Sequence, residues 1–363
     1  MNNTIGKNVR LTLFGESHGK CVGAVLDGIP SGIPVNESAI AAALDARRPA
    51  GKISTARQER DEFQIMSGVF RGVTNGSPLC IIIPNADVKS EDYGDSVSAA
   101  RPGHADYTSH VRNAGFEDFR GGGHFSGRLT AAIVAAGAVV ISALEAKGIC
   151  IGTHISSIKD VYDRSFDDVI SDVKSLKNDP FPVLDEASGR DMIAAIEAAR
   201  ESGDSVGGTL ESAICGLPAG VGDPWFDTVE GMLSLALFSI PAVKAVEFGA
   251  GTKLASMNGS ESNDPFIIKD GKITTGTNNC GGILGGMTTG GDVLFRTTVK
   301  PTPTIYKKQH TVDLSSGEET TVSAKGRHDP CIVHRAASVQ TAMAAIVTAD
   351  LLAARYGEEW LRP

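Results

Sequence analysis

The segment from Arg101 to Arg128 holds the densest group of residues that could do chemistry. It contains four arginines, three histidines and six glycines, and no long apolar run interrupts it. Arginine offers a planar fork of N–H donors to carboxylates and phosphates, and histidine transfers protons near neutral pH. Glycine lets the backbone approach a ligand closely and expose its N–H groups. Together these residue types predict an anion site that also holds a proton-transferring group.

An apolar run, Leu129 to Leu144, follows directly and predicts a buried helix. The N-terminus of that helix would point at the glycine-rich stretch 121–128, and helix N-termini favour anions. The alternative is a glycine-rich surface loop with scattered charges. Three further segments rich in glycine, or in arginine and histidine, favour the anion site: GESHG at 15–19, NNCGGILGGMTTGG at 278–291 and KGRHDP at 325–330.

Two of these segments allow a second interpretation. Ser17 occupies the nucleophile position of a G-x-S-x-G motif, but that motif requires a helix after the serine, whereas the residues after Gly19 predict a strand. A serine hydrolase is therefore the weaker interpretation. His104 follows a Pro-Gly turn three residues after Arg101, so both side chains could face one anion; a capped turn before a helix at Asp106 explains the same residues equally well.

Nucleotide-binding loops and metal sites are not indicated. The Gly-Lys pairs lack the following Ser or Thr of a P-loop, and no G-x-G-x-x-G stands in a strand–helix setting. His328, Asp329, Cys331 and His334 could ligate a metal, but a proline separates them and helical H-x-x-x-H spacing is absent. The sequence therefore predicts a small, multiply anionic substrate and no metal.

Composition limits the class of protein. The chain has 363 residues, 41% hydrophobic content and a net charge of −9, so it can bury a large core and has no overall basic character for nucleic acid or anionic membranes. Only 6% of residues are aromatic, which leaves few platforms for stacking bases. The six cysteines lack C-x-x-C spacing, and no signal peptide or membrane span is indicated. We expect a cytoplasmic protein without nucleic-acid or membrane partners.

Hydrophobic periodicity predicts an α+β fold with sheets packed on helices, as one domain over residues 1–363. The predicted strands are 9–14, 21–29, 63–70, 79–83, 149–158, 209–215, 245–248 and 293–299, with the wholly apolar run at 79–83 in a central position. The predicted helices are 39–47, 129–147, 165–177, 190–201, 227–237 and 336–355. Two Ala-rich helices, 129–147 and 336–355, each follow a Gly/Arg/His segment, which suggests a possible internal duplication.

Taken together, these segments resemble the chorismate synthase family. GESHG, RPGHADYT, DFRGGG, GGILGG, KPT and KGRHDPC appear in the family's order between Gly15 and Cys331. The resemblance implies a β-α-β sandwich, with helices packed between antiparallel sheets, and a homotetramer. It implies a carbon–oxygen lyase that eliminates phosphate from 5-enolpyruvylshikimate 3-phosphate, in a 1,4-anti sense, to give chorismate. The reaction requires reduced FMN without net redox change, and it is the last shared step of the shikimate pathway.

The resemblance also implies roles for individual residues. His18 would be a general acid for the leaving phosphate, His104 would protonate or stabilise the reduced flavin, and Asp329 would act with flavin N5 to remove the ring proton. Ser17 would add a hydrogen bond. Substrate would be bound by Arg47 or Arg48, Arg101, Ser126, Arg128 and Arg327. FMN would lie across His124, Phe125, Ser126, Pro241, Ala242, Gly285, Lys300, Pro301, Thr302, Pro303, Thr304 and Arg327.

The chain departs from the family pattern in the flavin loop. Many members have GGGRSSAR where this chain has GGGHFSGR at 121–128. His124 and Phe125 thus replace an arginine and a serine, and the flavin contact there would be made by backbone or by an aromatic ring.

Two more departures affect other contacts. The loop after Arg48 is one residue shorter than the common form, so the second cation expected there would be Lys52 or Arg57, and the resemblance leaves a nicotinamide-nucleotide contact at this loop open. Pro241 replaces an amide side chain, which leaves only its carbonyl for FMN. A non-catalytic anion-binding homologue is the alternative to the lyase, but His18, His104 and Asp329 are all retained. No reductase domain is evident, so we expect reduced FMN to be supplied from outside the chain.

Overall fold

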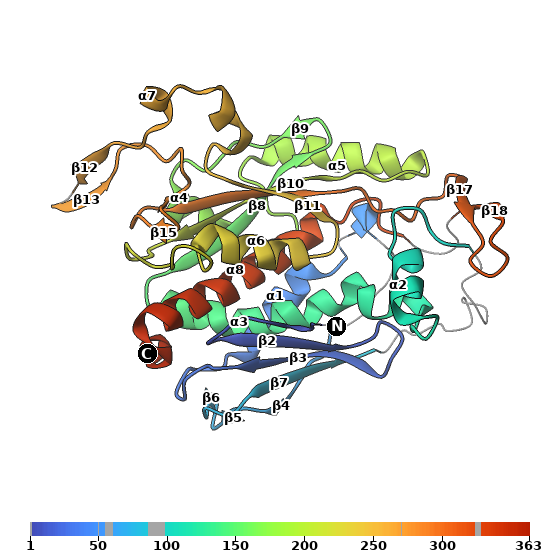
Figure 1. Ribbon diagram of the computed structural model, residues 1–363, viewed down its shortest axis with the longest axis horizontal. Coiled ribbons are helices and arrows are strands. Elements are labelled where there is room, and N and C mark those ends of the chain that lie inside the picture. Colours follow the sequence, from blue (N-terminus) through green and yellow to red (C-terminus); the bar gives the residue numbers. More distant parts are fainter. Residues whose placement is uncertain (1, 50, 55–60, 86–98, 270, 324–327) are drawn as a thin grey trace.

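Two five-stranded antiparallel sheets enclose a layer of helices (Figure 1). The computed structural model describes residues 2–49, 51–54, 61–85, 99–269, 271–323 and 328–363. The main buried apolar cluster runs from Val9 to Leu361 and so joins both ends of the chain. This arrangement confirms the α+β sandwich expected from the sequence.

The first sheet is formed by the N-terminal part of the chain. Its strand order is β1 (Thr4–Ile5), β2 (Arg10–Gly15), β3 (Cys21–Asp27), β7 (Leu79–Pro84) and β4 (Gln64–Ser67). The apolar strand β7 pairs with β3 on one side and β4 on the other, with Ile81 opposite Ala24 and Ile65. Its predicted central position is therefore confirmed.

The second sheet is formed by later segments. Its order is β11 (Val243–Phe248), β16 (Val293–Val299), β10 (Gly208–Cys215), β8 (Cys150–Ile158) and β9 (Val161–Tyr162). The inner helices are α1 (Glu37–Arg47), α3 (Thr130–Ala146), α6 (Val229–Ser239) and α8 (Val333–Tyr356), whereas α4 (Val169–Ser175) and α5 (Glu186–Glu201) lie on the outer side of this sheet.

Shorter helices and strands complete the fold. The helices are α2 (Asp106–Asn113), α7 (Gly259–Ser262) and 3-10 turns at 51–53, 120–125, 127–129, 251–256 and 358–361. The paired strands are β5 (Val69–Phe70) with β6 (Val73–Thr74), β12 (Phe266–Lys269) with β13 (Lys272–Thr275), β14 (Ile283–Leu284) with β15 (Met287–Thr288), and β17 (Gln309–Val312) with β18 (Glu319–Val322).

Small residues let the two central helices pack closely. A Cβ atom on Gly137 of α3 would lie 2.4 Å from Cβ of Ala342 on α8, so only glycine fits there. α3 contacts β2, β3 and β7 of the first sheet, and α8 contacts β8 and β10 of the second. Gly127–Ala146 and Val333–Tyr356 are long and apolar enough to cross a membrane, but their apolar windows are 78% and 89% buried, as expected of core helices.

Several predicted boundaries are wrong in detail because capping residues set the helix starts. α5 begins at Glu186 rather than residue 190, since Asp185 accepts a hydrogen bond from the Ser188 N–H. Asp168 caps α4, so this helix is shorter than the predicted 165–177. The predicted strand 63–70 is divided into β4 and β5, with Gly68 between them at φ 87°.

The elements that carry the motifs meet at one end of the sandwich. α2, the start of α3 and the β2–β3 turn lie toward the right-hand end of the view in Figure 1. The loop after β16 reaches the same end, where Lys300 contacts the turn before α2.

Candidate active site

The glycine-rich loop before α3 brings two of the predicted histidines together. Gly121, Gly122 and Gly123 have φ angles of 57°, 85° and 52°, which residues with side chains rarely adopt. A Cβ atom on Gly121 would lie 2.2 Å from Cε1 of His18, and one on Gly122 would lie 3.2 Å from Cε1 of His104. The loop backbone therefore lies directly against both imidazole rings.

Ser17 and His18 lie in the turn between β2 and β3. Both are buried, and Ser17 Oγ lies 3.1 Å from His18 Nδ1. The Ser17 N–H donates to the Gly123 carbonyl at 3.1 Å, which fixes this turn against the glycine loop. Because β3 follows the turn and pairs antiparallel with β2, the helix that a hydrolase nucleophile elbow requires is absent from this described segment.

His104 belongs to a three-residue polar group at the start of α2. Its Nδ1 lies 2.7 Å from Asp106 Oδ1, and Arg101 donates to the same carboxylate from Nε at 2.8 Å and Nη2 at 2.7 Å. The N-cap residue Ala105 offers no side-chain cap. The group thus orients an imidazole and a guanidinium together, in addition to starting a helix.

The carboxylate of Asp106 stays ionised beside His104. Burial alone would raise the pKa of Asp106, but the hydrogen bonds from Arg101 and His104 outweigh it and hold that pKa well below its usual range. A carboxylate only accepts hydrogen bonds, so the contact with Asp106 favours a proton on Nδ1 of His104; Arg101 Nη2 also lies 3.1 Å from this nitrogen. Nε2 lies beside Gly122, where a Cβ would be 3.3 Å from it.

Arg47 and Arg128 differ from Arg48 and Arg101 in the burial of their side chains. Both are buried and contact the carboxylate of Asp61, Arg128 through a short bond to Oδ1 and Arg47 at 3.4 Å from Oδ2. Arg47 also donates to Thr130 Oγ1 at 2.9 Å and to the Gly127 carbonyl at 2.8 Å. These two arginines are built into the wall of the site, at the N-terminus of α3.

Among the predicted substrate-binding arginines that the structure describes, Arg48 and Arg101 have the most exposed side chains. Arg48 is 34% exposed and pairs with Asp45; Arg101 is 25% exposed. Of the two arginines at the end of α1, Arg48 therefore has the more exposed side chain. Arg327, Arg57 and the side chain of Lys52 lie outside the described residues.

Lys300 joins three of the predicted flavin-binding segments. Its Nζ donates to the Gly103 carbonyl at 2.5 Å, and its N–H donates to the Ala242 carbonyl at 3.0 Å. A Cβ on Gly103 would lie 3.3 Å from Cβ of Pro303, and Ser205 Oγ donates to the Thr302 carbonyl at 2.7 Å. The loop 300–304 is thereby held beside the turn that carries His104.

The unusual residues of the glycine loop have defined contacts. His124 Nδ1 lies 2.9 Å from the Gly15 carbonyl, and Nε2 lies 3.2 Å from Asn3 Oδ1, so this ring ties the loop to the first sheet. Phe125 is 37% exposed and lines a small hollow beside His104. Ser126 Oγ accepts from the Arg128 N–H at 3.2 Å.

Two predicted residues lie on other segments. Asp329 precedes α8 and pairs with Arg335, at 2.6 Å between Oδ2 and Nη1. Gly285 lies in the β14–β15 turn, whose next residue, Gly286, packs against Thr228 at the start of α6.

A cavity of about 420 Å³ lies apart from these residues, between α1, α3, α8 and β8. Its walls are mainly small apolar side chains such as Ala138, Ala337 and Ala342, and Lys174 and Lys177 stand among its polar lining. It contains none of the histidines or arginines discussed above. We therefore identify the candidate active site by its converging polar side chains and not by the volume of a cavity.

Comparison with known proteins gives one consistent result. The sequence model of the family described as chorismate synthase matches residues 9–353. A chorismate synthase of Thermococcus kodakarensis is 45% identical over 96% of this chain and 97% of its own length, and one of Dehalococcoides mccartyi is 44% identical over 97% and 96%. The chain belongs to the chorismate synthase family. A crystal structure of a chorismate synthase matches with a TM-score of 0.75 at 29% identity, covering 97% of this chain and 94% of that one.

Membership of the chorismate synthase family confirms the resemblance drawn from the motifs. It also confirms the fold, the lyase class and the reaction, which is elimination of phosphate from 5-enolpyruvylshikimate 3-phosphate to form chorismate in aromatic amino acid biosynthesis. The substrate is accordingly a small molecule.

Sequence reasoning missed three charged residues that organise the site. Asp106 stands two residues after His104, and this spacing was a usable signal. Arg335 stands six residues after its partner Asp329, but its second partner, the carbonyl of Arg47, is distant in the chain. Asp61 gave no local signal, since its partner Arg128 is 67 residues away.

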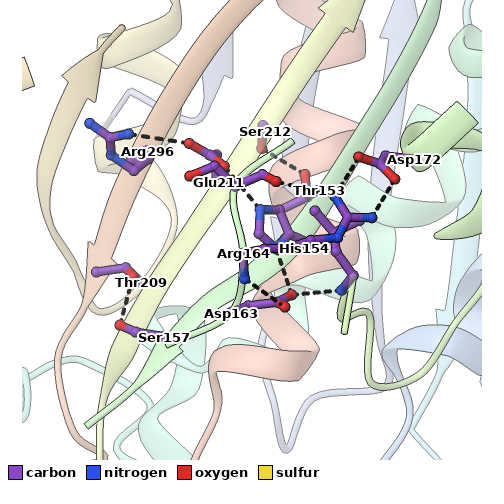
Figure 2. Close-up of polar contacts among 12 residues, drawn as sticks. Thr153, His154, Ser157, Asp163, Arg164, Asp172, Thr209, Glu211, Ser212 and Arg296 are labelled. Carbon is purple, nitrogen blue, oxygen red and sulfur yellow. Dashed lines mark hydrogen bonds and ion pairs between the residues drawn. The ribbon is translucent and has the colours of Figure 1, made fainter. Parts of the chain in front are cut away.

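A second buried polar cluster lies on the outer face of the second sheet, away from the glycine loop (Figure 2). His154 is fully buried between two carboxylates, with Nδ1 3.1 Å from Asp163 and Nε2 3.0 Å from Glu211. Arg296 donates to Glu211 at 3.2 Å. No three His, Cys, Asp or Glu side chains in the described ranges are arranged to hold a metal ion.

The cluster makes stability depend on pH in a defined direction. Burial alone would lower the pKa of His154, but hydrogen bonds to Asp163 and Glu211 outweigh it and raise that pKa. A raised folded-state pKa contributes stability that is complete below the unfolded pKa of about 6.5 and is lost as pH rises through the folded value. We expect the free energy of unfolding to fall above pH 6.5 more steeply in the wild type than in His154→Gln, as measured by urea denaturation.

His310 provides the matched control for this experiment, because it is exposed on β17. His310→Gln should keep the wild-type pH dependence. Equal slopes for wild type and His154→Gln would show that His154 is not protonated in the folded state near neutral pH.

Proposed function

We propose that the phosphate elimination takes place where the glycine loop meets His18 and His104, with reduced FMN as cofactor. The observation that carries this proposal is the contact of Gly121 and Gly122 with those two rings. We further propose that the chain acts as a single domain within a homotetramer in the cytoplasm, supplied with reduced FMN from outside.

The charges present suit the substrate. It carries two carboxylates and a phosphate, and guanidinium groups are the side chains that match such anions. Arg48 and Arg101 have exposed area for direct contact, while Arg47 and Arg128, buried on Asp61, raise the positive charge of the wall. Arg327 is proposed as a further ligand of substrate and FMN.

A cation and an aromatic ring near His104 are of the kinds that suit the phosphate and the ring system of a flavin. Phe125 lines the hollow beside His104, and Lys300 and the loop 300–304 lie against the same turn. We propose that these residues hold FMN with His124, Ser126, Pro241, Ala242 and Gly285. When bound, reduced FMN lends electron density to the breaking C–O bond and recovers it.

Protein groups would handle the protons. His18 donates a proton to the departing phosphate, because a protonated phosphate is the better leaving group, and Ser17 holds the ring through its contact with Nδ1. Asp329 accepts the proton removed from the ring of the substrate. His104, oriented at Nδ1 by Asp106, would donate to the reduced flavin from Nε2 when both ring nitrogens carry protons.

An anaerobic assay tests the proposal. Purified protein, 5-enolpyruvylshikimate 3-phosphate and chemically reduced FMN should release chorismate and phosphate in equal amounts, and oxidised FMN should give neither. Flavin binding without turnover would instead favour the anion-binding homologue, and turnover without flavin would exclude the cofactor. A Ser17 hydrolase would be labelled by an organophosphorus probe, whereas the proposed lyase would not.

A further inference from the structure

Arg335 connects the proposed base to the substrate-binding side of the site. It is the third residue of α8, and its Nη1 lies 2.6 Å from Asp329 Oδ2. Its Nε donates to the carbonyl of Arg47, at the end of α1, at 3.1 Å. A single planar guanidinium thus holds a carboxylate and a backbone carbonyl in fixed relation.

The surroundings of Arg335 are rigid on both sides. The preceding residue, His334, is fully buried, with Nε2 2.7 Å from Ser54 Oγ and its ring 5.9 Å from that of Phe181. Burial lowers the pKa of His334 to about 4, so this ring is neutral and adds no competing charge. Arg47, on the other side, is bound into the start of α3 through Thr130 and Gly127.

Asp329 needs such support because of where it lies. It stands in an irregular segment before α8 rather than within a helix or strand, and loop side chains are less precisely placed than those on regular elements. A misplacement of about 1 Å of a reacting group can cost about 100-fold in rate. The contact with Arg335 occupies Oδ2 and directs the carboxylate plane from the first turn of α8.

We propose that Arg335 is the positioning residue for Asp329, holding its carboxylate through Oδ2 so that the plane of the group that takes up the proton is fixed. The inference rests on the proposed role of Asp329 as base. Arg335 need not touch the substrate, and its contribution belongs to the proton-transfer step rather than to substrate binding.

The test combines kinetics with a double-mutant cycle. Arg335→Gln should lower kcat by about 10- to 100-fold, with little change in KM for substrate or in the Kd for reduced FMN. The isotope effect with substrate deuterated at the abstracted position should rise, because proton removal becomes more rate-limiting. Arg335→Lys should restore part of kcat, since lysine keeps the charge but lacks the fork that reaches both partners.

The cycle with Asp329→Asn separates this inference from the proposed function. If Arg335 acts through Asp329, Arg335→Gln should add little to the loss already caused by Asp329→Asn. Wild-type activity in Asp329→Asn would overturn the proposed base. A large loss in Asp329→Asn, together with wild-type kinetics in Arg335→Gln, would overturn the inference alone.

Arg164 supplies the matched control arginine. It forms a two-pronged ion pair with Asp172, at 2.8 and 2.7 Å, on the outer side of the second sheet. Arg164→Gln should leave kcat and the isotope effect unchanged. Equal kinetic losses in the two glutamine variants, accompanied by equal falls in Tm, would assign Arg335 a purely structural role and overturn the inference.

Discussion

Replacing His104 by alanine is expected to lower kcat by about two to four orders of magnitude, the range for loss of a positioned proton-transferring group. The ring lies against Gly122 and its Nδ1 lies 2.7 Å from Asp106 Oδ1, so the substitution removes an imidazole that is held in a defined orientation. The measurement is the anaerobic rate of chorismate formation at saturating substrate and reduced FMN.

His110 is the control for this substitution. It lies in α2, which follows His104, and also contacts a carboxylate, that of Glu117, at 3.0 Å, but its side chain is 44% exposed. His110→Ala should retain wild-type kcat. If His104→Ala kept more than about a tenth of wild-type kcat, far above the range for a general acid–base group, the chemical role of His104 would be excluded.

The sequence predicted the parts of the site that depend on local residue types. Glycines with positive φ, such as Gly121, can be anticipated because few other residues tolerate that conformation. The helix after the loop follows from an apolar run, and the convergence of GESHG with RPGH follows from family resemblance. Local chemistry alone indicated an anion site but did not indicate which reaction it serves.

The pairing of charged residues that are far apart in the sequence could not be predicted from local residue types. Arg47 and Arg48 are neighbours of identical type, yet one is buried on Asp61 and the other is a third exposed. The difference arises from the direction in which each side chain leaves the end of α1, and that direction depends on the packing of α1 against α3. The contact of Arg335 with the carbonyl of Arg47 could not be predicted either, because the two residues are 288 positions apart in the sequence.

The second large effect concerns Asp61, whose replacement by asparagine is expected to reduce the free energy of unfolding by about 3–5 kcal/mol. Its side chain is 2% exposed, and each carboxylate oxygen faces a different buried guanidinium, that of Arg47 or of Arg128. Asparagine has nearly the same shape but no charge, so two buried cations would lose their shared counter-charge. Urea denaturation at pH 7 measures the change.

Glu145→Gln is the matched control, since Glu145 and Lys177 form an ion pair at 2.7 Å with side chains 36% and 55% exposed. Solvent screens such a pair, and its loss should cost no more than about 1 kcal/mol. A cost for Asp61→Asn as small as this would mean that other groups neutralise Arg47 and Arg128. A large cost would show that the positive wall of the site depends on one buried carboxylate. Asp61 offsets the repulsion between the two guanidinium groups, and the protein can therefore keep both of them beside a multiply anionic substrate.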